Sequence, residues 1–150
     1  MTDFMLVHAT AVAIDGSAIL LRGPPGTGKS DLALRLIDGG AQLVADDQVE
    51  LRQATNRVWV KAPAAIAGLI EIRGVGILRL RALEDIPLAI CVDLLQSGEI
   101  ERLPGCRCED VLGIAVPLIA VSAFEASAAA KLRLALRAFS AEPPPAILPR

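Results

Sequence analysis

The 150-residue sequence predicts an α/β domain, on three observations. An apolar, strand-like run at residues 18–22 leads into a glycine-rich loop and then into a helical pattern that begins at Asp31. Further apolar runs have the length of strands, and the run at 86–95 hardly alternates, as expected of a strand covered on both faces. An Ala- and Leu-rich segment at 127–139 favours a helix. Strands and helices that follow one another in this way indicate the α/β class.

Composition limits the classes of protein that fit. A net charge of −2 and 3% aromatic residues lack the basic footprint and the stacking surface of a nucleic-acid binder. No apolar run reaches the roughly 18 residues of a membrane-spanning helix without a charge or proline. Residues 1–4 contain no basic region typical of a signal peptide. We therefore expect one domain in a cytoplasmic protein that binds neither nucleic acid nor membrane.

The three cysteines do not predict a metal site or a disulfide. Cys106 and Cys108 are too close together for a zinc site, and no second cysteine pair accompanies them. Cys91 lies inside an apolar run, so we expect it to be a small buried hydrophobic residue.

The glycine-rich loop matches the phosphate-binding pattern G-x-x-x-x-G-K-[ST]. Its glycines let the backbone approach a polyphosphate, and its N–H groups form an anion cradle with the positive end of the following helix. The lysine would reach the outer phosphates, and the serine hydroxyl would lie where a Mg²⁺ ligand belongs. A simple Gly/Pro turn is the alternative, but the flanking strand and helix favour nucleotide binding. The loop comprises Gly23, Pro24, Pro25, Gly26, Thr27, Gly28, Lys29 and Ser30.

Residues 5–14 predict a strand, and the Asp15-Gly16 pair predicts a tight hairpin to the strand that feeds the loop. His8, the single histidine, falls in the first strand of that hairpin. A histidine among apolar neighbours is usually a hydrogen-bonded core residue, and a functional role is the alternative.

After the loop, a helix at residues 30–38 ends at a glycine pair that suits a left-handed cap. A short apolar strand follows and closes on Asp46 and Asp47. In phosphate-loop folds, an acid that holds the metal or orients the attacking group is found at this place. The alternative for either aspartate is a turn residue.

Residues 49–53 and 57–61 predict a second hairpin, and a strand is expected over residues 69–78. Glu71 and Arg73 would share one face of that strand, while its glycines mark a bend or a close approach. A surface strand with a salt bridge is the alternative interpretation.

Towards the C-terminus, residues 96–113 predict a polar connection or a partner-facing segment, and residues 116–121 a last strand. The final helix carries basic residues in its C-terminal half, which suits the helix dipole. We expect a domain over residues 1–141 and a proline-rich tail at 142–150.

Three stretches together resemble the HPr kinase/phosphorylase family. They are the phosphate loop, L-V-A-D-D-Q-V-E at residues 43–50 and I-E-I-R-G-V-G-I at residues 70–77, and the last two are far more specific than the loop. The chain is similar to the family's C-terminal catalytic domain, in a short form without the N-terminal domain. The resemblance implies a P-loop kinase domain with a mixed sheet flanked by helices, similar to phosphoenolpyruvate carboxykinase.

The resemblance also implies the activity. Members use ATP with Mg²⁺ to phosphorylate a serine of HPr, a phosphocarrier of the phosphotransferase system, and they can reverse the reaction by phosphorolysis. This reaction regulates carbon and nitrogen metabolism, and family members tend to form hexamers. Carried over by position, the catalytic residues are Asp47 as general base, His8 and Lys29. The implied metal ligands are Ser30, Glu71 and Asp46, and the signature motif comprises Glu71, Ile72, Arg73, Gly74 and Gly76.

The sequence departs from the family pattern in ways that keep two other functions open. Longer members carry P-G-R-N, with a catalytic arginine, after the last strand, and residues 116–122 contain no arginine. Lys131 or Arg133 would have to replace it. The loss favours a catalytically inactive ATP-binding regulatory domain as one alternative. A small-molecule P-loop kinase is the other, and its arginine-rich lid would have only Arg102 and Arg107 within residues 96–110.

Overall fold

A computed structural model describes residues 3–140 and confirms the α/β class. Its strands are β1 (Phe4–His8), β2 (Thr10–Ile14), β3 (Ser17–Arg22), β4 (Gln42–Ala45), β5 (Gln48–Ala54), β6 (Arg57–Lys61), β7 (Leu69–Ile72), β8 (Gly76–Arg79), β9 (Ile86–Leu94), β10 (Cys108–Val111) and β11 (Ile114–Val121). Its helices are α1 (Lys29–Asp38) and α2 (Ala128–Ser140), with 3₁₀ turns at Ala64–Ile66 and Ser97–Glu99. The predicted tail lies outside the described residues.

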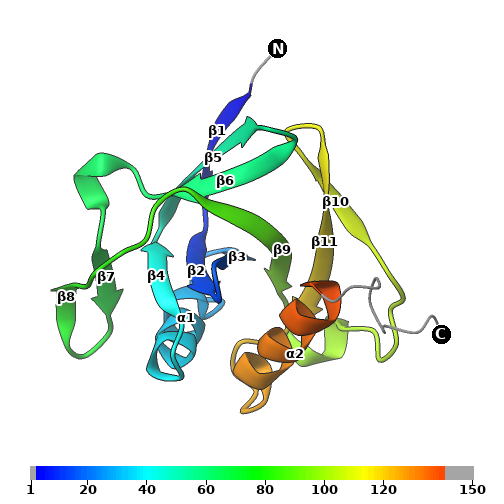
Figure 1. Cartoon of the computed structure of the whole chain (residues 1–150). Helices are drawn as coiled ribbons and strands as arrows, with labels where there is room; N and C mark the ends of the chain where they lie inside the picture. The colour runs from blue at the N-terminus through cyan, green and yellow to red at the C-terminus, as the bar shows by residue number, and fades with distance from the viewer. Residues whose placement is uncertain (1–2, 141–150) are drawn as a thin grey trace.

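One large, curled, mixed sheet dominates the fold (Figure 1). Its strand order is β1-β5-β6-β9-β3-β2-β4, with β11 also paired to β9 and β10 to β11. At its centre β3, β9 and β11 run parallel, while the outer pairs are antiparallel. The strand predicted to be covered on both faces, β9, is confirmed as central. Because parallel strands end at one edge, the loops after β3 and β11 meet there.

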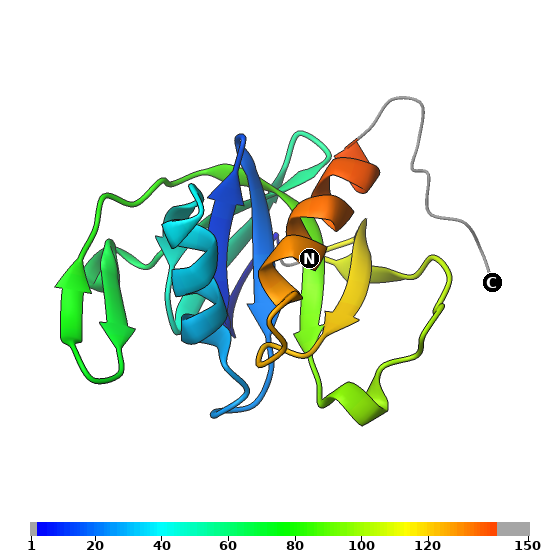
Figure 2. The same ribbon diagram turned by 90° about the horizontal axis from the view of Figure 1, so that it is seen from below.

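Two hydrophobic cores lie on opposite faces of this sheet. Both helices cover one face, where Leu32 and Leu36 of α1 and Leu132 of α2 pack on Ile19 and Ile90 (Figures 1 and 2). The opposite face is covered by the curled-over strands β5 and β6. Neither described helix has the length and apolar composition that crossing a membrane requires.

The Asp15-Gly16 hairpin is confirmed, but the strand before it is not continuous. Asp15 and Gly16 adopt φ of 51° and 78°, and β2 and β3 pair antiparallel on either side. The predicted strand at 5–14 breaks at Ala9, because β1 pairs with β5 whereas β2 pairs with β3 and β4. His8 therefore ends β1 opposite Gln48 and is exposed, so its placement in the hairpin was wrong.

The segment at 69–78 is two strands instead of one. Gly74, with φ of 87°, lies in a turn closed by the Val75 N–H, which donates to the carbonyl of Ile72 at 3.0 Å. β7 and β8 thus form a separate two-stranded hairpin, visible at the left of Figure 1. The apolar pattern is the same for one long strand and for two short ones, which is why the periodicity did not reveal the turn.

The polar segment at 96–113 contains a strand that the sequence analysis missed. β10 pairs antiparallel with β11 through the turn at Leu112 and Gly113, where φ is 51° and 86°. Strand β10 has a low intrinsic strand propensity because it contains Glu109 and Asp110, so tertiary pairing decides its conformation.

The cysteines should fall into two reactivity classes. Cys91 is buried in β9, and burial raises its pKa to about 11, whereas Cys106 and Cys108 are exposed. At pH 8 the Cys91 thiol is protonated as well as shielded, and only the thiolate is reactive. We expect a chromogenic disulfide reagent to label two thiols per native chain and a third only in denaturant. Cys91→Ala should abolish the denaturant-dependent class, and three equally fast thiols in the native protein would contradict this burial.

Candidate active site

A pocket of about 430 Å³ opens at the carboxyl edge of the parallel strands, beside the N-terminus of α1. It brings together the phosphate loop, the turn after β4, the β7–β8 hairpin and the β11–α2 loop. Its lining residues are Gly26, Gly28, Lys29, Ser30, Asp31, Leu34, Asp47, Glu71, Ile72, Arg73 and Phe124.

The loop glycines have distinct structural roles. Gly28 caps the start of α1 with φ of 93°, a left-handed conformation that favours glycine. A Cβ at this position would lie 2.8 Å from the Cβ of Ala123 and 3.2 Å from the Phe124 ring. Gly26 is also left-handed, at 85°, but a Cβ there would meet only open space. The unpaired N–H groups of the first helical turn add the positive end of the α1 dipole to the cradle.

Lys29 extends back over the loop that precedes it. Its Nζ donates hydrogen bonds to the carbonyl oxygens of Gly23 at 2.6 Å and of Pro24 at 3.1 Å. The Thr27 hydroxyl donates to the same Pro24 carbonyl at 2.7 Å and closes the loop. The Lys29 ammonium group therefore lies across the loop, held by two of its carbonyl oxygens.

Asp46 is a buried carboxylate that joins three segments. Its Oδ1 accepts hydrogen bonds from the hydroxyls of Thr10 at 3.0 Å and Ser30 at 2.8 Å. Its Oδ2 accepts the backbone N–H of Glu71 at 3.2 Å. Only 7% of the residue is exposed, so these donors replace the water that a buried carboxylate loses. The contact fixes the serine of the phosphate loop relative to β2 and β7.

Asp47, the next residue, has a different environment. It is exposed, adopts φ of 73° and lines the pocket. Within residues 3–140, its carboxylate has no described hydrogen bond or ion pair. Its backbone carbonyl accepts the Ala9 N–H at 3.2 Å, which fixes the turn on the strand crossing between β1 and β2. The pocket therefore contains a carboxylate that is available to a substrate.

The β7–β8 hairpin contributes Glu71, Ile72 and Arg73 to the pocket. In the described part of the chain, neither Glu71 nor Arg73 has a side-chain hydrogen bond or ion pair. Lys29 and Arg73 are the two cationic residues in the lining. Asp31, another lining residue, is ion-paired with Arg35.

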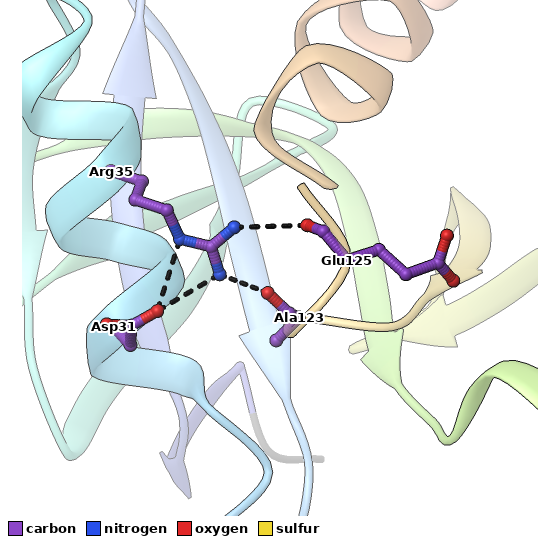
Figure 3. Close-up of polar contacts among 4 residues, drawn as sticks. All are labelled: Asp31, Arg35, Ala123 and Glu125. Carbon is purple, nitrogen blue, oxygen red and sulfur yellow. Dashed lines mark hydrogen bonds and ion pairs between the residues drawn. The ribbon is translucent and has the colours of Figure 1, made fainter. Parts of the chain in front are cut away.

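Arg35 connects α1 to the β11–α2 loop. Figure 3 shows its guanidinium between Asp31 on one side and the carbonyls of Ala123 and Glu125 on the other. The bond to Glu125 is 3.3 Å long, and the ion pair with Asp31 is 3.1 Å. The loop that carries Phe124 into the pocket is thereby held by the helix that begins at the phosphate loop.

The pocket residues fit a magnesium ion delivered with a nucleotide. No cluster of three or more His, Cys, Asp or Glu side chains able to hold a metal occurs among the described residues. Mg²⁺ seldom needs such a cage, because one or two carboxylates and substrate phosphates complete its shell. The Ser30 hydroxyl and the Glu71 carboxylate supply oxygen ligands of the required kind in the lining, and the Asp46 carboxylate lies beneath them, bonded to Ser30.

The structure brings most of the predicted site residues together. Gly26, Gly28, Lys29, Ser30, Asp47, Glu71, Ile72 and Arg73 line the pocket, and Asp46 contacts Ser30 beneath it. The other predicted residues are not in the lining: Gly23, Pro24, Pro25 and Thr27 of the loop, and His8, Gly74 and Gly76. Lys131 is paired with Glu125 at 3.2 Å, and Arg133 donates to the carbonyl of Leu36, so neither lines the pocket.

The sequence analysis missed five residues at or beside the pocket: Thr10, Asp31, Leu34, Arg35 and Phe124. Arg35 and Asp31 have the i, i+4 spacing of a helical ion pair, which is the one local signal available. The other contacts depend on the tertiary fold.

Comparisons with known proteins agree with this geometry. A family model described as HPr Serine kinase C-terminal domain matches residues 1–132. An HPr kinase/phosphorylase from Caldicellulosiruptor bescii is 40% identical over 127 residues, which cover 76% of this chain and 40% of the relative. One from Streptococcus thermophilus (strain ATCC BAA-491 / LMD-9) is 32% identical over 127 residues, with 77% and 41% coverage. The chain therefore spans about 40% of the length of these curated relatives.

The fold also matches a solved structure, the Hpr(Ser) kinase/phosphatase from Coxiella burnetii. The TM-score is 0.79 at 29% sequence identity, and the match covers 89% of this chain and 94% of that one.

The two neighbouring aspartates should differ in their contribution to stability. In Asp46→Asn, the amide NH₂ must face one of three donors, so we expect a loss of about 1–3 kcal/mol in the free energy of unfolding. Asp47→Asn is the matched control. Its side chain is exposed and asparagine tolerates φ above zero, so we expect a change within about 0.5 kcal/mol. Urea denaturation followed by circular dichroism measures both, and equal stabilities would disprove the role of Asp46.

Proposed function

The chain belongs to the HPr serine kinase C-terminal domain family, and we propose that it is an ATP-dependent protein serine kinase acting on an HPr-type phosphocarrier. One observation carries the proposal: the available carboxylate of Asp47 shares a pocket with the phosphate loop and Lys29. Transfer to a hydroxyl needs a phosphate cradle, a cation and a group that accepts the hydroxyl proton. The pocket offers all three.

In this proposal, the β and γ phosphates of ATP lie in the loop cradle beside Lys29. Bound Mg²⁺ would be held by Ser30, Glu71 and Asp46 and would neutralise phosphate charge. The substrate serine approaches Asp47, which takes the hydroxyl proton as the serine oxygen bonds to the γ-phosphorus. The bond from that phosphorus to the β–γ bridging oxygen breaks, and ADP leaves with that oxygen.

Longer members of the family carry the catalytic arginine of P-G-R-N after the last strand, which is β11 here. The loop after β11 therefore bears on the reverse reaction, phosphorolysis. Its pocket residue is Phe124, which carries no charge, and Lys131 and Arg133 are held elsewhere. We propose Arg73 as the second cation on the transferred phosphoryl group, because it lines the pocket beside the loop. The uncharged Phe124 favours a second candidate, an ATP-binding regulatory domain that does not transfer phosphate.

Other features of the proposal rest on the family. They are a catalytic role for His8, phosphorolysis, assembly into a hexamer and a part in carbon and nitrogen regulation. A cytoplasmic location and a domain over residues 1–141 rest instead on the composition of the sequence. His8 contributes to the surroundings of Asp47 through the backbone: it precedes Ala9, whose N–H donates to the carbonyl of Asp47.

Asp47→Asn should abolish phosphoryl transfer while leaving ATP binding nearly unchanged, because the amide cannot accept the serine proton. The measurement is transfer of labelled γ-phosphate from ATP, with Mg²⁺, to a purified HPr-type phosphocarrier, beside ATP binding by calorimetry. Transfer at the wild-type rate would refute the assignment of Asp47. Tight binding without any transfer by the wild-type chain would favour the regulatory domain.

Arg73→Gln should lower kcat by about 100-fold, the usual effect of losing one donor to transition-state charge. Arg79→Gln is the matched control, since Arg79 lies on the same hairpin, donates to the Ala67 carbonyl at 3.4 Å and is outside the pocket lining. Steady-state kinetics with ATP separates kcat from KM. An equal effect of both substitutions would assign Arg73 to the folding of the hairpin.

A further inference from the structure

An aromatic ring forms one wall of the phosphate pocket. Phe124 is 72% exposed, the largest exposed fraction among the described large hydrophobic residues, and it lines the pocket. The neighbouring lining residues at the start of α1, Lys29, Ser30 and Asp31, are polar or charged. Because the ring is exposed within the pocket, a ligand bound there can cover it and remove apolar surface from water.

The backbone around this ring is fixed on both sides. Arg35 donates to the carbonyls of Ala123 and Glu125, the two neighbours of Phe124 in the chain (Figure 3). Asp31 holds the same guanidinium from the first turn of α1. The loop therefore presents the ring from a position that is tied to the phosphate-binding helix, before any ligand arrives.

The ring is also in contact with the cradle itself. A Cβ on Gly28 would lie 3.2 Å from two carbons of the Phe124 ring. The ring thus borders the point where the loop passes into α1. A ligand whose phosphates lie on the N–H groups of Gly28 and Lys29 has the ring as its neighbour.

The topology places this wall at the edge of the sheet where the phosphate loop lies. β3 and β11 run parallel on either side of β9, so the phosphate loop and the Phe124 loop leave the same edge of the sheet. Ligands of α/β sheets bind outside that edge. Leu34, one turn into α1, and Ile72 are the other apolar side chains of the lining. The pocket that holds the phosphate loop therefore also has apolar side chains in its lining, and Phe124 is the aromatic one.

We propose that Phe124 is the platform on which the nucleobase of the bound nucleotide stacks. The site then selects a nucleoside triphosphate over an inorganic polyphosphate, because only the nucleotide covers the ring. Every nucleobase has a π face, so any base can stack on an aromatic side chain. This inference rests on the proposed function, because it takes the phosphate loop as the binding site of the donor.

The test compares two ligands on the same protein, ATP and inorganic tripolyphosphate, each with Mg²⁺ and measured by calorimetry on the full chain. Phe124→Ala should weaken ATP binding by about 10- to 100-fold, the usual effect of losing one base stack, and leave tripolyphosphate within about 2-fold. Phe124→Tyr keeps the ring and should keep ATP affinity. Phe124→Leu keeps apolar volume without a π face and should behave like the alanine variant.

Phe4→Ala is the matched control for loss of an exposed phenylalanine. Phe4 is 44% exposed on β1 and lies outside the lining of the phosphate pocket, so neither affinity should change. Thermal unfolding of each variant verifies that it is folded at the assay temperature.

The outcomes separate this inference from the proposed function. Equal weakening of both ligands by Phe124→Leu would show that the ring shapes the loop, and unchanged affinities would show that no base touches it; either result overturns the inference. If the wild-type chain binds tripolyphosphate as tightly as ATP, the inference fails while the phosphate site stands. If it binds neither ligand, the proposed function fails and the inference fails with it.

Discussion

The buried carboxylate of Asp46 is the constraint on which the site depends. A carboxylate removed from water must receive hydrogen bonds, and this one receives them from Thr10, Ser30 and the backbone of Glu71. Those three donors come from three separate segments of the chain. Satisfying a single buried carboxylate therefore fixes the phosphate-loop serine, the hairpin before it and strand β7 in one arrangement.

A second group of contacts sets the opposite wall of the pocket. The parallel pairing of β3, β9 and β11 brings the phosphate loop and the Phe124 loop to one edge of the sheet, but it does not determine the distance between them. Arg35 fixes this distance because it joins α1 to the carbonyls beside Phe124. Gly28 lets the two loops approach closely because it has no Cβ. Asp46 thus holds the phosphate loop itself, and Arg35 holds the Phe124 loop on the helix that follows it.

Local signals in the sequence predicted the parts of the site that local chemistry determines. The loop residues 23–30, the Asp15-Gly16 turn and the acidic pair after β4 were all readable because each is a short pattern with a backbone reason. His8 was misplaced because the chain changes partner strands at Ala9, and no local pattern records such a change. Arg35 and Phe124 escaped notice because the arginine contacts residues 88 and 90 positions away.

The two adjacent aspartates show that the contacts that hold this site in place, its frame, involve other residues than its chemistry does. Sequence alone gives Asp46 and Asp47 the same side chain at the same place, and the resemblance implies a role for each. The structure buries the first among three donors and leaves the second exposed at φ of 73° in the pocket. Any change at Asp46 perturbs three segments at once. Asp47, Arg73 and Phe124 line the pocket that this frame supports, so donor choice and transfer can vary there while the fold is kept.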